Sequence, residues 1–142
     1  MKYSTYSEAQ TAALAKKFVT SLKQGTIVGL IGDLGAGKTA FVKGVAKALS
    51  LKQTVNSPTF VLMRVYTIKK HPFLKHLIHV DAYRLKSAKS LTAIGLSDYI
   101  KDPSALVMIE WADRVQLIIP KSAIMVRFKH LTPKSRQITI SK

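Results

Sequence analysis

The sequence contains no cysteine, and this absence excludes disulfide bonds, thiolate catalysis and zinc sites built on cysteine. No apolar run approaches the roughly 20 residues of a membrane-spanning helix, and the N-terminal stretch lacks the apolar region of a secretion signal. We therefore expect a cytoplasmic protein with no membrane partner. The length of 142 residues and the hydrophobic content of 47% predict a single domain, residues 1–142, with a substantial core.

Acidic residues are also scarce. Lysine and arginine number 23 against 7 aspartates and glutamates, which gives a formal net charge of +16. This imbalance predicts attraction to polyanions or to an acidic partner surface, and a merely solvated basic surface is the alternative. The basic residues are spread along the chain, without the dense run or aromatic pattern of a sequence-specific nucleic-acid binder. Any chemistry that needs a carboxylate must use one of Glu8, Asp33, Asp81, Asp98, Asp102, Glu110 and Asp113.

A glycine-rich segment, residues 32–39, matches the phosphate-binding pattern G-x-x-x-x-G-K-[ST] at every fixed position. Its glycines allow successive backbone N–H groups to turn toward phosphate oxygens. The lysine of this pattern reaches the β- and γ-phosphates of a nucleotide, and the hydroxyl that follows it ligates Mg²⁺. The segment consists of Gly32, Asp33, Leu34, Gly35, Ala36, Gly37, Lys38 and Thr39.

The residues on either side of this segment have the expected character. Residues 26–31 are short, apolar and β-branched, which is typical of a buried strand. Residues 39–49 place Phe41, Val45 and Leu49 at helical spacing, and a helix N-terminus at the end of the loop favours an anion. The order of strand, loop and helix therefore predicts a phosphate-binding loop rather than a simple glycine-rich turn.

Hydrophobic periodicity predicts further helices and strands. Residues 5–23 predict a helix capped by Thr5 or Ser7. The other predicted elements are strands over 60–68 and 74–81 that form a hairpin, a short helix over 87–93, a buried strand over 105–109, and a second hairpin from strands 123–128 and 136–140. Together these elements predict an α/β protein with the P-loop NTPase fold, in which helices flank a mixed parallel and antiparallel sheet to give three layers.

Two of the carboxylates follow predicted strands. Glu110 comes directly after the apolar strand 105–109, the arrangement in which P-loop enzymes present an acid beside the bound Mg²⁺. Asp81 ends another strand and is predicted to be a functional carboxylate. His79 shares a strand face with Asp81, and we expect it to be packed or hydrogen-bonded rather than a metal ligand.

The segment Ser57-Pro58-Thr59 has two interpretations. Many P-loop NTPases carry a threonine in the loop after the first helix that senses the γ-phosphate and Mg²⁺. Because Pro58 restricts the backbone on both sides, the segment is equally well explained as a turn that leads into a strand.

Four segments, taken in order, resemble the TsaE family (formerly YjeE), bacterial ATPases of tRNA threonylcarbamoyladenosine synthesis. They are residues 32–39, Ser-Pro-Thr-Phe at 57–60, His-Val-Asp-Ala-Tyr-Arg-Leu at 79–85 and Ile-Glu-Trp at 109–111. The resemblance spans nearly the whole chain, and four ordered motifs are much more specific than the phosphate-binding pattern alone.

The resemblance implies a small P-loop ATPase that uses ATP and Mg²⁺, is weak alone, and acts with the TsaB–TsaD pair, which attaches a threonylcarbamoyl group to tRNA. Contact with tRNA would be indirect or through that complex. By the family pattern, Lys38, Asp81 and Glu110 are the catalytic residues, and Thr39, Glu110 and Asp81 hold the metal. Around the nucleotide the same pattern places residues 32–39, Ser57, Thr59, Trp111, Arg136 and, on the adenine side, Glu8.

Two other functions are compatible with a phosphate-binding loop. A small-molecule kinase needs an acceptor site and usually lid arginines; Arg84, Arg114, Arg127 and Arg136 are available, but no lid insertion is visible in the sequence. A nucleotide-gated binding module needs no turnover, and the carboxylate predicted beside Lys38 and Thr39 argues for hydrolysis instead.

Overall fold

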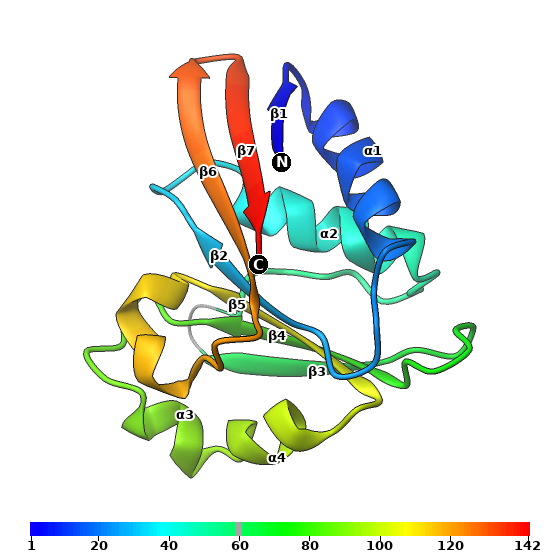
Figure 1. The fold of residues 1–142 in the computed structure, drawn as a ribbon, viewed down its shortest axis with the longest axis vertical. Coiled ribbons are helices and arrows are strands. Elements are labelled where there is room, and N and C mark those ends of the chain that lie inside the picture. The colour runs from blue at the N-terminus through cyan, green and yellow to red at the C-terminus, as the bar shows by residue number, and fades with distance from the viewer. Residues whose placement is uncertain (59–60) are drawn as a thin grey trace.

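The computed structural model describes residues 1–58 and 61–142. The strands of these residues form one sheet of seven: β1 Lys2–Thr5, β2 Ile27–Ile31, β3 Met63–Thr67, β4 His76–Asp81, β5 Ala105–Glu110, β6 Ile124–Thr132 and β7 Ser135–Ser141. Their order across the sheet is β1-β7-β6-β2-β5-β4-β3 (Figure 1). The neighbouring strands β6, β2, β5 and β4 are parallel, whereas β3, β7 and β1 each run antiparallel to the strands beside them.

Helices cover both faces of this sheet (Figure 1). Helices α1 Glu8–Val19 and α2 Lys38–Ala48 pack on one face, where their apolar side chains join one buried cluster. The other face is covered by α3 Lys89–Ala93, α4 Leu96–Lys101 and the 3₁₀ segment η1 Ala112–Ile118, which belong to a second cluster. The predicted α/β class and mixed sheet are therefore confirmed. Among the described residues, no helix is long and apolar enough to cross a membrane.

The central strands owe their position to continuous apolar sequence. All residues of β5 are buried, and so are the first four of β2, because both strands lie between the two helical layers. Strand β6 alternates instead: Val126 and Phe128 are buried, and Arg127 and Lys129 are exposed. This difference shows that only one face of β6 is covered in that part of the strand.

The N-terminal prediction was wrong in one respect. The helix expected over residues 5–23 spans Glu8–Val19, and Lys2–Thr5 form an edge strand that pairs with β7. Ser7 caps α1, as its hydroxyl accepts a hydrogen bond from the Gln10 N–H at 3.1 Å. A four-residue strand of mostly polar residues has no recognisable apolar pattern, and it forms here because β7 offers a free edge.

Helix α1 approaches α2 closely, because Gly44 of α2 has no side chain. A Cβ at Gly44 would lie 2.8 Å from the Ala15 Cβ and 3.0 Å from the Ala12 Cα, both in α1. This close packing of small residues fixes α1 against the helix that follows the glycine-rich segment. It therefore brings Glu8, at the start of α1, to the same end of the molecule as that segment.

The parallel strands end together at one edge of the sheet. Leu30 and Asp81 are both in register with Glu110, so the last residues of β4 and β5 lie side by side next to the end of β2. Ligands of open α/β sheets bind outside the carboxyl ends of the strands. Asp81 and Glu110, the two carboxylates that the sequence predicted to be functional, lie at this edge.

Candidate functional site

The glycine-rich segment connects β2 to α2 and leaves the N-terminus of α2 open. Gly35 has φ +74° and Gly37 has φ +107°, backbone conformations that favour glycine. Gly37 precedes the first residue of α2, and no side chain caps that helix end. A Cβ at Gly37 would lie 3.2 Å from the Arg136 Cδ and Nε, so this guanidinium rests directly against the loop.

Lys38 is 4% exposed and folds back over its own loop. Its ammonium donates to the carbonyl oxygens of Gly32 at 2.5 Å and Asp33 at 2.8 Å. The same Nζ lies 4.0 Å from the centroid of the Trp111 ring, within the range of a cation–π contact. The positive charge is thus stabilised by neutral oxygens and an aromatic face, groups that a phosphate oxygen would outcompete.

Burial lowers the pKa of the Lys38 ammonium below its ordinary value of 10.5, and the surrounding carboxylates, Glu110 first, oppose the effect without cancelling it. Between the lowered pKa and 10.5 the unfolded chain holds a proton that the folded chain has lost. Stability contributed through Lys38 must therefore rise with pH in this window.

We expect the unfolding free energy of the wild type, minus that of Lys38→Met, to be constant near neutral pH and to increase as the pH rises through this window. Denaturant titrations of both proteins at a series of alkaline pH values measure the difference. Subtracting the unfolding free energy of the methionine variant cancels the contribution of the other lysines and tyrosines, because both proteins contain them. A difference that does not change with pH would contradict the lowered pKa.

Glu110 connects three elements of the site. Its carboxylate accepts hydrogen bonds from the Thr39 hydroxyl at 2.9 and 3.1 Å. Its Oε1 also lies 2.8 Å from the Nε2 of His79, whose side chain is fully buried. His79 is therefore packed and hydrogen-bonded, as expected, and it orients Glu110 toward α2. A carboxylate that receives these bonds is held in one position.

Asp81 lies beside Glu110 and is 3% exposed. Its Oδ2 accepts a hydrogen bond from the Ser57 hydroxyl at 2.8 Å, and its Oδ1 accepts one from the Tyr83 N–H at 2.9 Å. Ser57 is thus tied to the end of β4, which supports either interpretation of the segment that contains it. Thr59, the other hydroxyl of that segment, lies outside the described residues.

A cleft of about 720 Å³ opens where these groups meet. The predicted residues that line it are Glu8, Leu34, Gly35, Gly37, Lys38, Thr39, Ser57, Asp81, Glu110, Trp111 and Arg136. Of the predicted residues that the structure describes, three are not in the lining: Gly32 and Asp33, whose carbonyls face Lys38, and Ala36, which is buried. The structure therefore brings most of the predicted residues into one cavity.

Sequence reasoning did not assign Tyr83 and Arg114 to this site. The Tyr83 ring lies 4.9 Å from the Trp111 ring, and the Arg114 guanidinium lies 5.1 Å from each ring. Arg114 also donates to the Tyr83 carbonyl. Trp111 has φ 58°, a left-handed conformation that is rare for an aromatic residue. These contacts hold the indole over Lys38. The sequence signal was the presence of Tyr83 in the 79–85 segment.

Two lysines of α2 also line the cleft without having been predicted. Lys43 and Lys47 are exposed and four residues apart, so they lie on the same side of the helix. Their spacing of four and eight residues from Thr39, which also lines the cleft, was the signal that could have found them.

The donors in the cleft fit a nucleotide and Mg²⁺. The oxygen atoms of Thr39, Glu110 and Asp81 are the hard ligands that Mg²⁺ prefers. Within the part of the chain that the structure describes, the buried Nε of Arg136 has no hydrogen-bond partner, and it lies against Gly37 at the loop. No group of three or more His, Asp or Glu side chains within residues 1–58 and 61–142 could hold a metal alone.

Comparison with known proteins identifies the family. The family profile described as "Threonylcarbamoyl adenosine biosynthesis protein TsaE" matches residues 5–138. The chain belongs to the TsaE family. The TsaE protein of Bacillus subtilis (strain 168) is 33% identical over 141 residues, which cover 99% of this chain and 85% of that protein. The TsaE protein of Treponema pallidum (strain Nichols) is 38% identical over 120 residues, 84% of each chain.

A solved structure supports the same family. The crystal structure of Bacillus subtilis YdiB matches with a TM-score of 0.80 at 29% identity, over 99% of this chain and 83% of that one. The resemblance to TsaE drawn from four sequence segments is therefore confirmed across the whole chain.

Proposed function

We propose that this TsaE-family protein binds MgATP in the cleft and hydrolyses it, in support of tRNA N6-threonylcarbamoyladenosine modification by the TsaB–TsaD complex. In this proposal residues 1–142 are one domain of the P-loop NTPase fold, and the transfer of the threonylcarbamoyl group belongs to the partners. The proposal rests on one observation above all. A buried lysine, a hydroxyl and two buried carboxylates converge beside an open helix N-terminus.

Phosphate binding is assigned to the loop and to Lys38. The ammonium would leave the carbonyls of Gly32 and Asp33 for the phosphate oxygens, since a charge-assisted bond is stronger than one to a neutral carbonyl. Loop N–H groups and the start of α2 would add neutral donors. Arg136 would approach the nucleotide from β7, and Glu8 would border the adenine side.

Hydrolysis is assigned to the carboxylates. Thr39 and Glu110, with Asp81 beside them, would hold Mg²⁺, which when bound neutralises charge on the phosphate oxygens. Asp81 would orient the attacking water, and Ser57 would keep the Asp81 carboxylate in place. The water oxygen forms a bond to the γ-phosphorus as the bond to the bridging oxygen breaks, and the proton that the water loses passes to a phosphate oxygen of the inorganic phosphate product. ADP leaves with that electron pair, and Lys38 stabilises the charge that develops.

Steady-state ATP hydrolysis tests this proposal, measured alone and with the TsaB–TsaD pair and tRNA of the same organism. We expect slow turnover alone and a rise of about tenfold with the pair, a size typical of coupling between sites. No response to the pair would contradict the partner assignment. Phosphate transfer to a small acceptor in place of water would show that the protein is a kinase. ATP binding without turnover under any condition would show a binding module.

A further inference from the structure

The antiparallel end of the sheet has one face that the helices leave uncovered. Val126, Phe128 and Ile138 of β6 and β7 are buried in the cluster beneath α1 and α2. Side chains alternate along a strand, so the intervening residues point to the opposite side. We call this side the ribbon face; it is formed by Lys2, Ser4, Arg127, Lys129, Gln137 and Thr139.

The strand register arranges these six side chains in two rows. Lys2 and Arg127 are both paired with Thr139, so the three form one row across β1, β7 and β6. Ser4 and Lys129 are both paired with Gln137 and form the next row. Each row spans roughly 10 Å, and the rows are about 7 Å apart along the strands. The first row thus carries two cations and a hydroxyl group, and the second carries one cation with a hydroxyl and an amide group.

No carboxylate competes for these cations. Residues 114–142 and residues 1–7 contain no aspartate or glutamate. Of the seven acids of the chain, Asp81 and Glu110 are buried in the cleft. The other five are Glu8, Asp33, Asp98, Asp102 and Asp113, none of which belongs to β1, β6 or β7. The ribbon face is therefore a basic surface whose lysine and arginine charges are not neutralised by carboxylates on the same strands.

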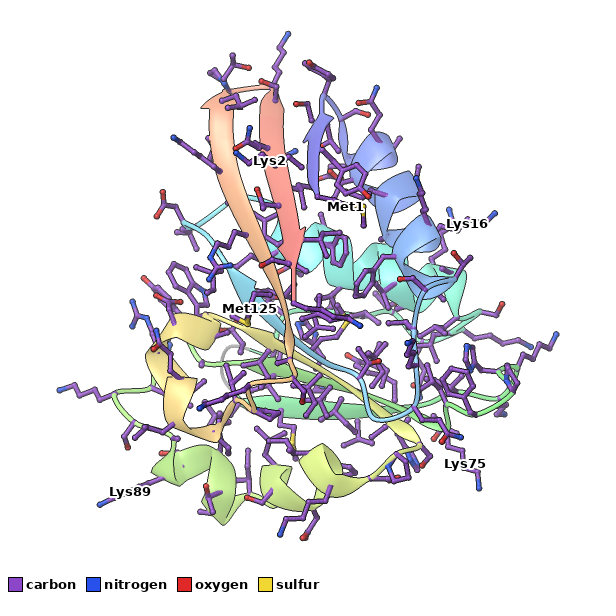
Figure 2. The ribbon with its side chains drawn as sticks, in the orientation of Figure 1. Met1, Lys2, Lys16, Lys75, Lys89 and Met125 are labelled. Atoms are coloured by element: carbon purple, nitrogen blue, oxygen red, sulfur yellow. The ribbon has the colours of Figure 1, made fainter. Side chains whose placement is uncertain are left out.

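The ribbon face is also open to solvent. Helices α3 and α4 lie at the other end of the molecule from the β6–β7 hairpin (Figure 1). Lys2 lies at the ribbon, whereas Met125 lies at the base of β6, close to η1 (Figure 2). Arg127 donates to the Ser141 hydroxyl at 3.3 Å, which confirms that its side chain lies on this side of the sheet. One such bond leaves most of the guanidinium donors available.

We propose that the ribbon face binds the phosphodiester backbone of RNA, and that this RNA is the tRNA on which the pathway acts. The assignment of the RNA as tRNA rests on the proposed function; the assignment of a phosphate backbone rests on the surface. Lysine, arginine, serine, threonine and glutamine are the side chains that contact phosphate and sugar oxygens. A protein partner would need an apolar, usually aromatic, centre, and the six residues of this face include none.

The test compares two triple variants by fluorescence anisotropy with a labelled, unmodified tRNA transcript at several salt concentrations. The first is Lys2→Gln/Arg127→Gln/Lys129→Gln on the ribbon face. The matched control is Lys69→Gln/Lys70→Gln/Lys75→Gln, which removes three exposed charges around the β3–β4 turn. We expect the first to weaken binding at least tenfold and to reduce the slope of log affinity against log salt by about two, since each lost phosphate contact removes roughly 0.7. The control should keep both values close to wild type.

A conservative variant keeps the test independent of folding. Lys2→Arg/Arg127→Lys/Lys129→Arg retains the charges and should retain tRNA binding. Equal weakening in the two glutamine variants, or no tRNA binding by the wild type, would overturn the proposal. So would a ribbon variant that keeps tRNA binding and loses TsaB–TsaD binding, because the face would then be a protein interface. ATP hydrolysis by the isolated glutamine variant of the ribbon face should match that of the wild type. Loss of tRNA binding and failure of the ATPase proposal are therefore detected by two different measurements.

Discussion

Lys38→Ala is expected to lower ATP hydrolysis at least a hundredfold and to weaken nucleotide binding. Removal of one preorganised group that stabilises transition-state charge costs about 10²–10³ in rate, and Lys38 is the cation that lies within the loop itself. Its ammonium is buried against two loop carbonyls and the Trp111 ring, so the alanine variant loses the positive charge that the loop itself holds. Rates of phosphate release at saturating ATP and the Kd of a fluorescent ATP analogue measure the two effects.

The matched control for this variant is Lys52→Ala, which removes an exposed lysine from the loop after α2. It should leave turnover and the Kd within about twofold of the wild-type values. Lys52 is not among the residues that line the cleft, and salt screens the charge of an exposed lysine. Hydrolysis by Lys38→Ala within a few-fold of wild type would mean that the glycine-rich segment does not bind the transferred phosphate.

Glu110→Gln is expected to reduce turnover by about 10²–10³ while ATP still binds. Glutamine keeps the volume and one oxygen acceptor, so the hydrogen bonds to Thr39 and His79 have a partner. It removes the negative charge that the proposed function assigns to the metal. Measurements of kcat and of ATP affinity, each across a Mg²⁺ titration, should show the loss in kcat and a shift to higher Mg²⁺ demand.

Asp113→Asn is the control for Glu110→Gln, since Asp113 is an exposed carboxylate three residues further along the chain. It should leave kcat unchanged. In cells, Glu110→Gln should fail to support tRNA modification, whereas a nucleotide-gated binding module would tolerate it. Normal turnover in this variant would remove Glu110 from the hydrolytic machinery.

The sequence predicted the parts of this molecule that local pattern determines. Strands β2 and β5 are continuous apolar runs, and the loop between β2 and α2 has fixed glycine positions. Each could therefore be predicted without knowing which element packs or pairs with it. Strand β1 was missed because its four residues gain their structure from pairing with β7. The hairpin of β3 and β4 was predicted from two apolar runs, although β3 begins at Met63, later than expected.

The contacts within the cleft depend on tertiary geometry. His79 reaches Glu110 because β4 and β5 are neighbours in one particular register, which no local pattern specifies. Arg136 comes close to Gly37 only because the C-terminal hairpin adds to the edge beyond β2. The folded-back position of Lys38 is set by the backbone carbonyl oxygens of two loop residues. Because every residue has a backbone carbonyl, no residue type in the sequence indicates this contact.

The position of Trp111 gives the protein an optical reporter. It is the chain's only tryptophan, and its ring lies 4.0 Å from the Lys38 ammonium. Indole emission depends on the electric field of nearby charges, so a lysine that moves from the ring toward a phosphate must change the spectrum. Nucleotide occupancy could then be followed in real time by intrinsic fluorescence, without a label, in the presence of any partner that lacks tryptophan.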